Sequence, residues 1–240
     1  MTDLPNEPRL LQAMDATWAP ARMWQSGPWV LRQGDGGGKR VSAVTTEALV
    51  SDADITDAET AMQKMGQPEL FMLRHGNETL DARLAQRGYR IVDPVLIYCT
   101  ESKAVATIAP EPLDAIPCEE PLRLAEELWA KGGINRARVD VMRRTPGPKT
   151  YLFGRFNNSP AGTAFVAIDN EIAMLHALEV IPEFRGFGIA RKVLGRAAIW
   201  ALENNAKYLS VVTTGENLPA QGLFAGLGMQ VVGRYHYRMK

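Results

Sequence analysis

The sequence predicts an α/β fold made of two similar units. Strand-like apolar runs alternate with helical patterns along the chain, and each half ends on the same short pattern. Asn77 precedes a helical run and then residues 88–92 (GYRIV), and Asn217 precedes a helical run and then residues 228–232 (GMQVV), at the same Asn-to-Gly spacing. Two units suit 240 residues, because a domain usually has about 100–150. The alternative is that two ordinary α/β segments share this pattern by chance.

Turn and cap signals predict the elements of the first unit. The glycine-rich residues 33–39 are interpreted as a hairpin connection, and phosphate binding is the alternative, although no helical pattern follows directly. Thr56 and Glu59 form a capping-box pattern that opens a helix ending before Gly66. The expected elements are a helix at 8–16, strands at 29–32 and 40–44, a helix at 57–65, a strand at 69–73, a helix at 79–86 and a strand at 89–99 that is broken near Asp93 and Pro94.

A proline-rich segment is expected to separate the two units. Residues 100–119 contain Pro110, Pro112 and Pro117 without sustained periodicity, so they are predicted to be a linker, with the units spanning residues 1–105 and 106–240. The second unit is expected to contain helices at 121–131, 136–144, 190–202 and 218–227 and strands at 150–156, 161–168, 172–181, 208–213 and 229–237.

The composition excludes several classes of function. Lys and Arg together number 27, as do Asp and Glu, which argues against nucleic acid as the main partner, because nucleic-acid-binding proteins usually carry a basic excess. No apolar run approaches the roughly 18 residues of a membrane span. The N-terminal segment lacks the apolar core of a signal peptide, so a cytoplasmic protein is expected. Cys99 and Cys118 lack metal-site spacing and are interpreted as reduced structural thiols, and no metal is expected.

The junction after the strand at 172–181 has the features of an anion site. A buried strand there runs into a glycine-containing turn that opens a long helix. The first helical turn presents backbone N–H groups without internal partners, and the helix dipole adds partial positive charge. Gly186 and Gly188 allow close approach of a ligand, while Arg185, Arg191 and Lys192 add full positive charges. A pyrophosphate would fit this site.

The turn at residues 185–190 (RGFGIA) distinguishes among phosphate loops. A Walker loop needs Lys and then Ser or Thr after its second glycine, and a dinucleotide fingerprint needs a third glycine where this chain has Arg191. The turn instead resembles the R/Q-x-x-G-x-G/A loop of the GNAT superfamily of N-acetyltransferases. Residues 178–182 (LEVIP) look like the strand before that loop, and the segment from Asn217 to Met229 resembles the family's second motif. The resemblance covers residues 172–240 and, more weakly, the hairpin at 150–168.

The resemblance implies the fold and the co-substrate. Each unit is expected to be a mixed, mostly antiparallel twisted sheet flanked by helices, and the second unit is expected to bind acetyl-CoA. The backbone of its fourth strand would pair with the pantetheine arm, and the loop N–H groups would bind the pyrophosphate. Side chains of the second motif would contact the pantetheine arm. The cofactor-binding residues implied are Leu178, Val180, Arg185, Gly186, Phe187, Gly188, Ile189, Ala190, Arg191, Asn217 and Phe224.

The first unit is expected to be degenerate. No segment between Val44 and Asn77 resembles the loop, and Asp57 and Glu59 in the first turn of the expected helix would repel a pyrophosphate. We therefore expect residues 1–105 to keep the shape of the unit without its cofactor site and residues 106–240 to form the catalytic domain.

The implied reaction is acyl transfer from a thioester to a primary amine, which must lose a proton before it attacks. His176 is the first candidate base, because its ordinary pKa of about 6.5 suits the task; a structural histidine is the alternative. Glu179 is the second, although strand alternation puts it on the opposite face from His176 unless a bulge intervenes. Phe224 occupies the position of the family's general-acid tyrosine, so Tyr235 or Tyr237 on the last strand is expected to substitute, or else the thiolate leaves without a dedicated acid.

The acceptor is expected to be a small-molecule amine such as an amino acid or a related metabolite. A protein N-terminus or lysine is the alternative acceptor, and a CoA-binding pseudo-acetyltransferase with a regulatory role is the alternative function. The chain is expected to be a monomer or homodimer without nucleic-acid or membrane partners. A basic run can bind a substrate carboxylate or form a solvated face, and it comprises Arg136, Arg138, Arg143, Arg144 and Lys149.

Overall fold

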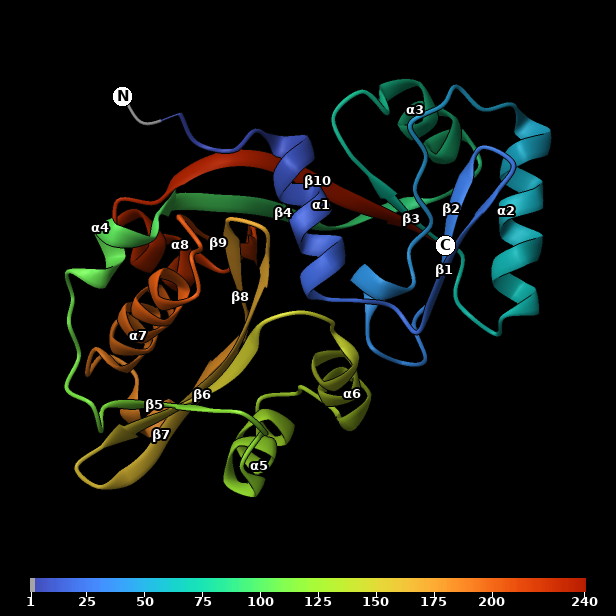
Figure 1. The fold of residues 1–240 in the computed structure, drawn as a ribbon. Helices are drawn as coiled ribbons and strands as arrows, with labels where there is room; N and C mark the ends of the chain where they lie inside the picture. Colours follow the sequence, from blue (N-terminus) through green and yellow to red (C-terminus); the bar gives the residue numbers. More distant parts are fainter. Residues whose placement is uncertain (1–2) are drawn as a thin grey trace.

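The structure, a computed structural model, describes residues 3–240 as one eight-stranded sheet, a separate two-stranded hairpin and helices on both faces of the sheet (Figure 1). In chain order the elements are α1 (Glu7–Thr17), β1 (Arg22–Ser26), β2 (Trp29–Gln33), the 3-10 turn η1 (Lys39–Val41), α2 (Asp52–Lys64), β3 (Leu70–Leu73), α3 (Glu78–Gln86), β4 (Arg90–Glu101), α4 (Ser102–Ala106), β5 (Ala115–Cys118), α5 (Arg123–Lys131), α6 (Arg136–Arg144), β6 (Lys149–Phe156), β7 (Ser159–Asp169), β8 (Ile172–Val180), the 3-10 turn η2 (Pro182–Phe184), α7 (Ile189–Glu203), β9 (Tyr208–Thr214), α8 (Leu218–Ala225) and β10 (Gln230–Met239).

The sheet has the strand order β3-β10-β4-β9-β8-β7-β6-β5 and is antiparallel except between β8 and β9. α7 packs on one face across β5 to β9, in a core that also holds residues of α4 and α8. α1 crosses the other face, where Leu10 and Met14 are fully buried among residues of β3, β4, β8 and β10. The predicted mixed, mostly antiparallel sheet flanked by helices is confirmed, but both halves contribute strands to one sheet instead of forming a sheet in each unit.

The glycine-rich segment is not a hairpin connection, so the predicted strand at 40–44 is wrong. The hairpin lies one element earlier, where β1 and β2 pair around Gly27, whose φ is +55°. After β2 the glycine-rich segment leads into η1 and packs against α6. A Cβ atom on Gly37 would lie 2.5 Å from Cγ2 of Val141, so this close contact requires a glycine. The glycines therefore serve packing as well as turning, which the local pattern did not indicate.

The predicted capping box at Thr56 and Glu59 is also wrong. α2 begins earlier, where Ser51 is the N-cap and exchanges hydrogen bonds with Asp54 in a capping box. The Thr56 hydroxyl instead donates to the Asp52 carbonyl one turn back within the helix. The residues around this helix contain several cap-like pairs, and the sequence pattern alone did not distinguish them.

Residues 100–119 are not a linker, because α4 and β5 lie within them. The proline-containing connection packs on α7: a Cβ atom on Gly195 would lie 2.9 Å from Ile108 and 3.1 Å from Pro110. Cys118 lies in β5, and both Cys99 and Cys118 are free. The boundary at 105/106 remains a prediction, and the sheet runs across it.

The two halves exchange strands within this sheet. β4 of the first half lies between β9 and β10 of the second, and β10 lies between β3 and β4. The pairing of β3 with β10 has the same register as the pairing of β9 with β4 when the two halves are offset by 140 residues. Leu73 pairs with His236, and the residues offset by 140, Thr213 and Leu96, also pair with each other. In the same way, the pair Leu70–Met239 corresponds to the pair Ser210–Cys99. The same interval separates Asn77 from Asn217. This register supports the duplication that the sequence predicts.

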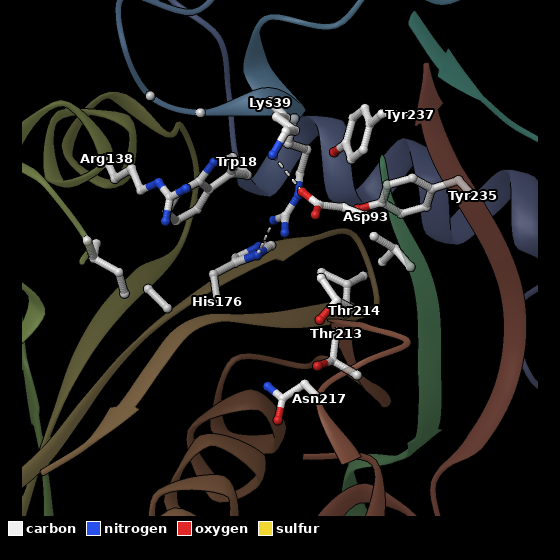
Figure 2. Close-up of a pocket in the computed structure, with 17 residues that line it drawn as sticks. Trp18, Lys39, Asp93, Arg138, His176, Thr213, Thr214, Asn217, Tyr235 and Tyr237 are labelled. Carbon is white, nitrogen blue, oxygen red and sulfur yellow. Dashed lines mark hydrogen bonds and ion pairs between the residues drawn. The ribbon is translucent and has the colours of Figure 1, made fainter. Parts of the chain in front are cut away.

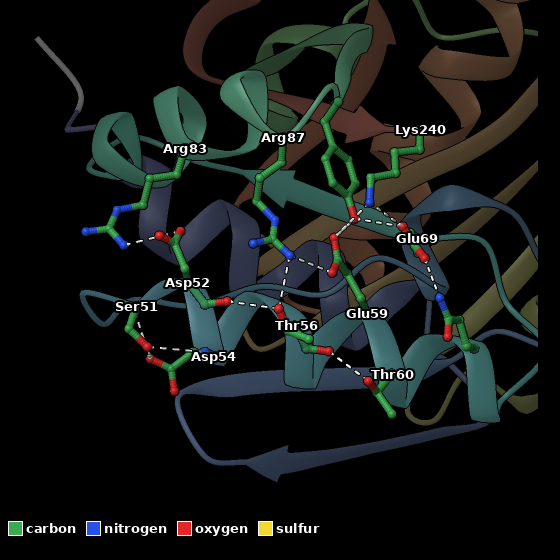
Figure 3. Close-up of polar contacts among 12 residues, drawn as sticks. Ser51, Asp52, Asp54, Thr56, Glu59, Thr60, Glu69, Arg83, Arg87 and Lys240 are labelled. Atoms are coloured by element: carbon green, nitrogen blue, oxygen red, sulfur yellow. Dashed lines mark hydrogen bonds and ion pairs between the residues drawn. The ribbon is translucent and has the colours of Figure 1, made fainter.

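A partly buried polar cluster ties Lys240 to the first half (Figure 3). The Tyr89 hydroxyl lies 2.7 Å from Glu59 Oε1 and 3.0 Å from Glu69 Oε2, and Lys240 Nζ lies within 3.2 Å of both carboxylates. Burial raises the pKa of Glu59, but hydrogen bonds from Tyr89, Arg87 and Lys240 outweigh it, so that the net pKa is below the ordinary value. The pKa of Glu69 is lowered by the same balance, with Gln63, Tyr89 and Lys240 as donors.

Tyr89→Phe should destabilise the protein by about 1–3 kcal/mol, because it removes the one phenol proton that two carboxylates share. Since their folded pKa values lie below the unfolded ones, both carboxylates stabilise the fold above the ordinary Glu pKa of about 4.3 and lose this contribution as the pH falls through their folded pKa values. Losing Tyr89 raises those pKa values, so the acid-unfolding midpoint should move to higher pH. Urea unfolding across pH checks both shifts. Tyr151→Phe is the matched control, because that buried hydroxyl has no hydrogen-bond partner in residues 3–240; equal effects of the two variants would contradict this account.

Candidate active site

The sheet splits between its two parallel strands. β8 and β9 are paired only from Ile172–Tyr208 to Leu175–Val211, yet β8 continues to Val180 and β9 to Thr214. Beyond Leu175 the edge of β8 that faces β9 is therefore open to another strand-like ligand. The side chains of Leu178 and Val180 pack against the core beneath α7.

A bulge in β8 changes which side chains share a face. Ala177 has a φ of +52°, and the register with β7 shifts between the pairs Phe165–His176 and Thr163–Glu179. Because one extra residue reverses the alternation, Glu179 lies on the same face as His176. Glu179 nevertheless points toward α5 and the turn after β8, where its Oε1 lies 3.0 Å from Arg185 Nη2. It does not line the cavity at His176.

The turn before α7 forms a cradle of unpaired backbone donors. Gly186 and Gly188 have φ values of +83° and +78°, and no atom lies within 4 Å of a Cβ built on either. Within residues 3–240 the N–H groups of residues 186–191 have no hydrogen-bond acceptor, whereas the Arg185 N–H donates to the Pro182 carbonyl. Ile189 is buried and fixes the start of the helix. The loop residues Phe187 and Gly188 are exposed, and Ala190 is half-buried.

The positive charges around this cradle are partly neutralised. Arg185 pairs with Glu179, and Lys192 Nζ lies 3.0 Å from Asp114 Oδ1. Arg191 is exposed and has no ion pair within the part of the chain that the structure describes. The cradle thus offers free N–H groups, a helix N-terminus and one unpaired arginine, which fit a pyrophosphate.

A cavity of about 330 Å³ lies where the sheet splits and is lined by both halves of the chain (Figure 2). Figure 2 shows Thr213, Thr214 and Asn217 below His176, with Trp18, Lys39, Asp93, Tyr235 and Tyr237 above it. The Asn217 side chain caps α8 by accepting a hydrogen bond from the Ala220 N–H, at 3.2 Å. The structure therefore brings His176, Tyr237 and Asn217 together at this cavity.

Both ring nitrogens of His176 are already engaged. Arg40 Nη1 lies 3.0 Å from Nδ1, and because arginine only donates, Nδ1 is the acceptor. The Thr17 hydroxyl donates to the Ala13 carbonyl, so its oxygen accepts the proton on Nε2, at 2.9 Å. Burial, followed by the charge of Arg40, holds the pKa of His176 well below 6.5. The ring is thus neutral, and it has no free lone pair for a substrate proton while Arg40 stays in place.

Two further predicted residues have contrasting positions. Tyr237 lines the cavity and is buried, and its burial and the neighbouring Tyr235 raise its pKa well above 10. Phe224 is 4% exposed in the core, with its ring centroid 5.4 Å from that of Tyr98, and does not line the cavity. Its predicted contact with the pantetheine arm stays a prediction.

The sequence prediction missed the first-half residues of the cavity. Trp18, Lys39, Arg40 and Asp93 all line it. Lys39 and Arg40 form a basic pair directly after the glycine-rich segment, and this pair was a usable signal in the sequence. The interpretation of that segment as a hairpin connection assigned the pair to a strand and not to a site. Asp93 had its own signal, since the predicted break in the strand coincides with a bulge and a φ of +45°.

Within residues 3–240, no helix combines the length and apolar character needed to cross a bilayer. The same part of the chain contains no cluster of three or more His, Cys, Asp or Glu side chains arranged for a metal ion.

Comparisons with known proteins agree with this geometry. Residues 116–229 match the acetyltransferase (GNAT) family. The chain is 27% identical over 239 residues to an uncharacterized N-acetyltransferase, YobR, from Bacillus subtilis (strain 168), with 94% of this chain and 95% of that protein covered. A GCN5-related N-acetyltransferase from Kribbella flavida has a similar fold, with a TM-score of 0.70, 18% identity and 97% and 94% coverage.

A tandem GNAT protein from the clavulanic acid biosynthesis pathway also has a similar fold, with a TM-score of 0.53 and 14% identity over 95% of this chain and 86% of that one. The family match spans the strand, loop and helix that form the cradle. Residues 116–229 are therefore similar to the GNAT acetyltransferase family, and the comparisons together support an acyltransferase.

Proposed function

We propose that the protein transfers an acetyl group from acetyl-CoA to a primary amine of a small molecule. The observation that carries this proposal is the continuity of the site: the unpaired N–H groups of residues 186–191, the open edge of β8 and the cavity at His176 follow one another along the sheet split. When bound, acetyl-CoA supplies a thioester carbonyl for the amine to attack and a thiolate leaving group.

The residues of the chain divide this work. The backbone N–H groups of residues 186–191 bind the pyrophosphate, and the open edge of β8 pairs with the pantetheine arm. The amide of Asn217 faces the same cavity and donates to the arm. The first half supplies the opposite wall of the cavity, so it acts as a substrate wall without a cofactor of its own.

The equivalent helix start in the first half is not a comparable cradle. Where the second half has the turn before α7, the first has Ser51, Asp52 and Asp54 at the start of α2. The Ser51 side chain already accepts the Asp54 N–H, and both acidic side chains lie in the first turn. Carboxylates there stabilise the helix but repel a phosphate.

Turnover with a panel of amines tests the function. Purified protein with acetyl-CoA should release free CoA thiol only when a suitable small primary amine is present, and mass spectrometry should detect that amine in acetylated form. Acetyl-CoA binding without thiol release would favour the regulatory alternative. Two observations support that alternative: both ring nitrogens of His176 are occupied, and Phe224 lies in the core. Acetylation of only peptide N-termini or lysines would contradict the small-molecule assignment.

Tyr237 is the proposed donor to the departing thiolate. Its raised pKa keeps the phenol protonated at neutral pH, and it lines the cavity. Tyr237→Phe should lower kcat by about a hundredfold, the effect of losing one hydrogen-bond donor from a developing anion, with acetyl-CoA affinity unchanged. Tyr235→Phe, beside it in the same cavity, is the comparison. Equal kcat values for Tyr237→Phe and the wild type would refute this role.

A further inference from the structure

We propose that the acceptor amine also carries a carboxylate, and that Arg40 and Arg138 bind it. This inference rests on the proposed function, since it names the substrate class of the same cavity. It assigns the binding of the acceptor to one residue from each half of the chain.

The charges in the cavity are unbalanced. Lys39 Nζ and Asp93 Oδ2 lie 2.7 Å apart and neutralise each other. Arg40 and Arg138 both line the cavity, and neither has a carboxylate within 4.0 Å in residues 3–240. The remaining titratable lining groups are the neutral ring of His176 and the phenols of Tyr235 and Tyr237. The cavity therefore holds two positive charges with no protein counterion.

Arg40 is held in place with donors to spare. It donates to His176 Nδ1, and its guanidinium carbon lies 5.6 Å from the centre of the Trp18 ring. Its Nε is buried without a hydrogen-bond partner among the described residues. Because this Nε has no surface open to the cavity, the donors left for a ligand are those of the Nη groups that His176 does not use, and a guanidinium binds a carboxylate through two such donors.

Arg138 approaches the same cavity from α6. Figure 2 shows its side chain reaching toward Trp18, on the side of the cavity away from Asn217. A Cβ atom on Gly38 would lie 3.2 Å from Arg138 Nε, so the guanidinium packs directly on the glycine backbone. Of the basic run in the sequence, Arg143 pairs with Glu126, and Arg144 and Lys149 bond to backbone carbonyls, whereas Arg138 alone lines the cavity.

The two ends of the cavity fit two ends of one small molecule. Arg138 and Asn217 lie on opposite sides of the cavity (Figure 2), and the open edge of β8 with Asn217 is where the thioester would arrive. A carboxylate bound by the arginines would direct the amine toward that end. About 330 Å³ suits an acceptor of amino-acid size, since ligand pockets start at about 300 Å³.

His176 acts in this arrangement as a positioning residue. Its neutral Nδ1 is the acceptor that orients Arg40, and Thr17 fixes the tautomer through Nε2. A glutamine can reproduce both bonds, because its carbonyl oxygen accepts and its amide nitrogen donates. Glutamine cannot act as a base, so it separates the two roles.

Matched pairs of acceptors test the proposal. Amino acids and their carboxamides, which lack the negative charge, should be compared by kcat/KM. The amides lose the ammonium proton more easily, so a preference for the acids cannot come from amine basicity. We expect at least about a tenfold preference for the acids, and Arg138→Gln should raise KM for the acids about ten- to a hundredfold, with a much smaller change for the amides. Arg136→Gln, exposed on the same helix, is the control and should change neither.

The positioning role has its own readout. His176→Leu, which cannot accept a hydrogen bond, should raise KM for the acids about tenfold, and His176→Gln should restore it. A hundredfold loss of kcat in His176→Gln would instead identify a catalytic base.

The outcomes separate the two proposals. Equal use of acids and amides, or an unchanged KM in Arg138→Gln, overturns the carboxylate site while the transferase function stands. A preference for phosphate-bearing amines over carboxylate-bearing ones also overturns it. Absence of thiol release with every amine overturns the proposed function and this inference with it.

Discussion

A chain of residues 106–240 alone should fail to fold, although it contains the whole GNAT-matched segment. β4 lies between β9 and β10, so its removal leaves the facing edges of both strands unpaired. The removal of α1 exposes Met174 and Tyr235, which are buried in the cluster around that helix. Unpaired strand edges and exposed apolar surface promote aggregation. Circular dichroism and thermal melting of the fragment should show no cooperative transition.

A split chain provides the matched control for this truncation. Residues 1–108 and 109–240, expressed together as two chains, should form a complex that melts cooperatively, because every strand pair of the sheet is then restored. The cut lies beyond α4 and before β5, so it interrupts no helix or strand. A fragment 106–240 that melts cooperatively and binds acetyl-CoA by itself would contradict the exchanged-strand account and support independent domains.

Gly188→Asp should reduce acetyl-CoA affinity by about a hundredfold or more. The residue is the N-cap of α7, and a carboxylate there faces the N–H groups proposed to bind the pyrophosphate. It would repel the phosphates and compete for their donors, and like charges in contact cost several kcal/mol. No atom lies within 4 Å of the added Cβ, and Asp tolerates the positive φ better than most residues, so the variant should still fold. Titration calorimetry measures the loss.

Two controls isolate the charge from the backbone strain. Gly188→Asn has nearly the same shape without the charge, so the difference between the two variants measures repulsion of the phosphates. Gly228→Asp places the same side chain at a φ of +71°, after α8 and outside the cradle, and should bind acetyl-CoA as the wild type does. If Gly188→Asp bound acetyl-CoA with wild-type affinity, the assignment of the pyrophosphate to this turn would be contradicted.

Local patterns predicted the cradle well because its chemistry is local. A buried strand, two glycines and a helix start are consecutive in the chain, and the structure has all three in the predicted order. The turn at Gly186 and Gly188 required only backbone freedom, which the residue type itself reveals. The bulge at Ala177 gave no such signal, because alanine rarely has a positive φ.

The acceptor cavity could not be predicted in the same way. Arg40 and His176 are 136 residues apart in the chain, and only the exchange of strands and the position of α1 bring them together. The glycines before Arg40 indicated a turn, but their close packing on α6 depends on tertiary structure. Similarly, Phe224 has the spacing of a cofactor contact but lies in the core beside Tyr98.

The number of acetyl-CoA molecules bound per full-length chain tests the central claim most directly. Titration calorimetry of the wild type should give one site per chain, in the second half, because α7 opens on Gly188 with unpaired N–H groups, whereas α2 opens on Ser51 with Asp52 and Asp54 in its first turn. Two sites per chain would contradict the loss of the cofactor site from the first half, and no binding at all would contradict the acetyl-CoA-dependent function.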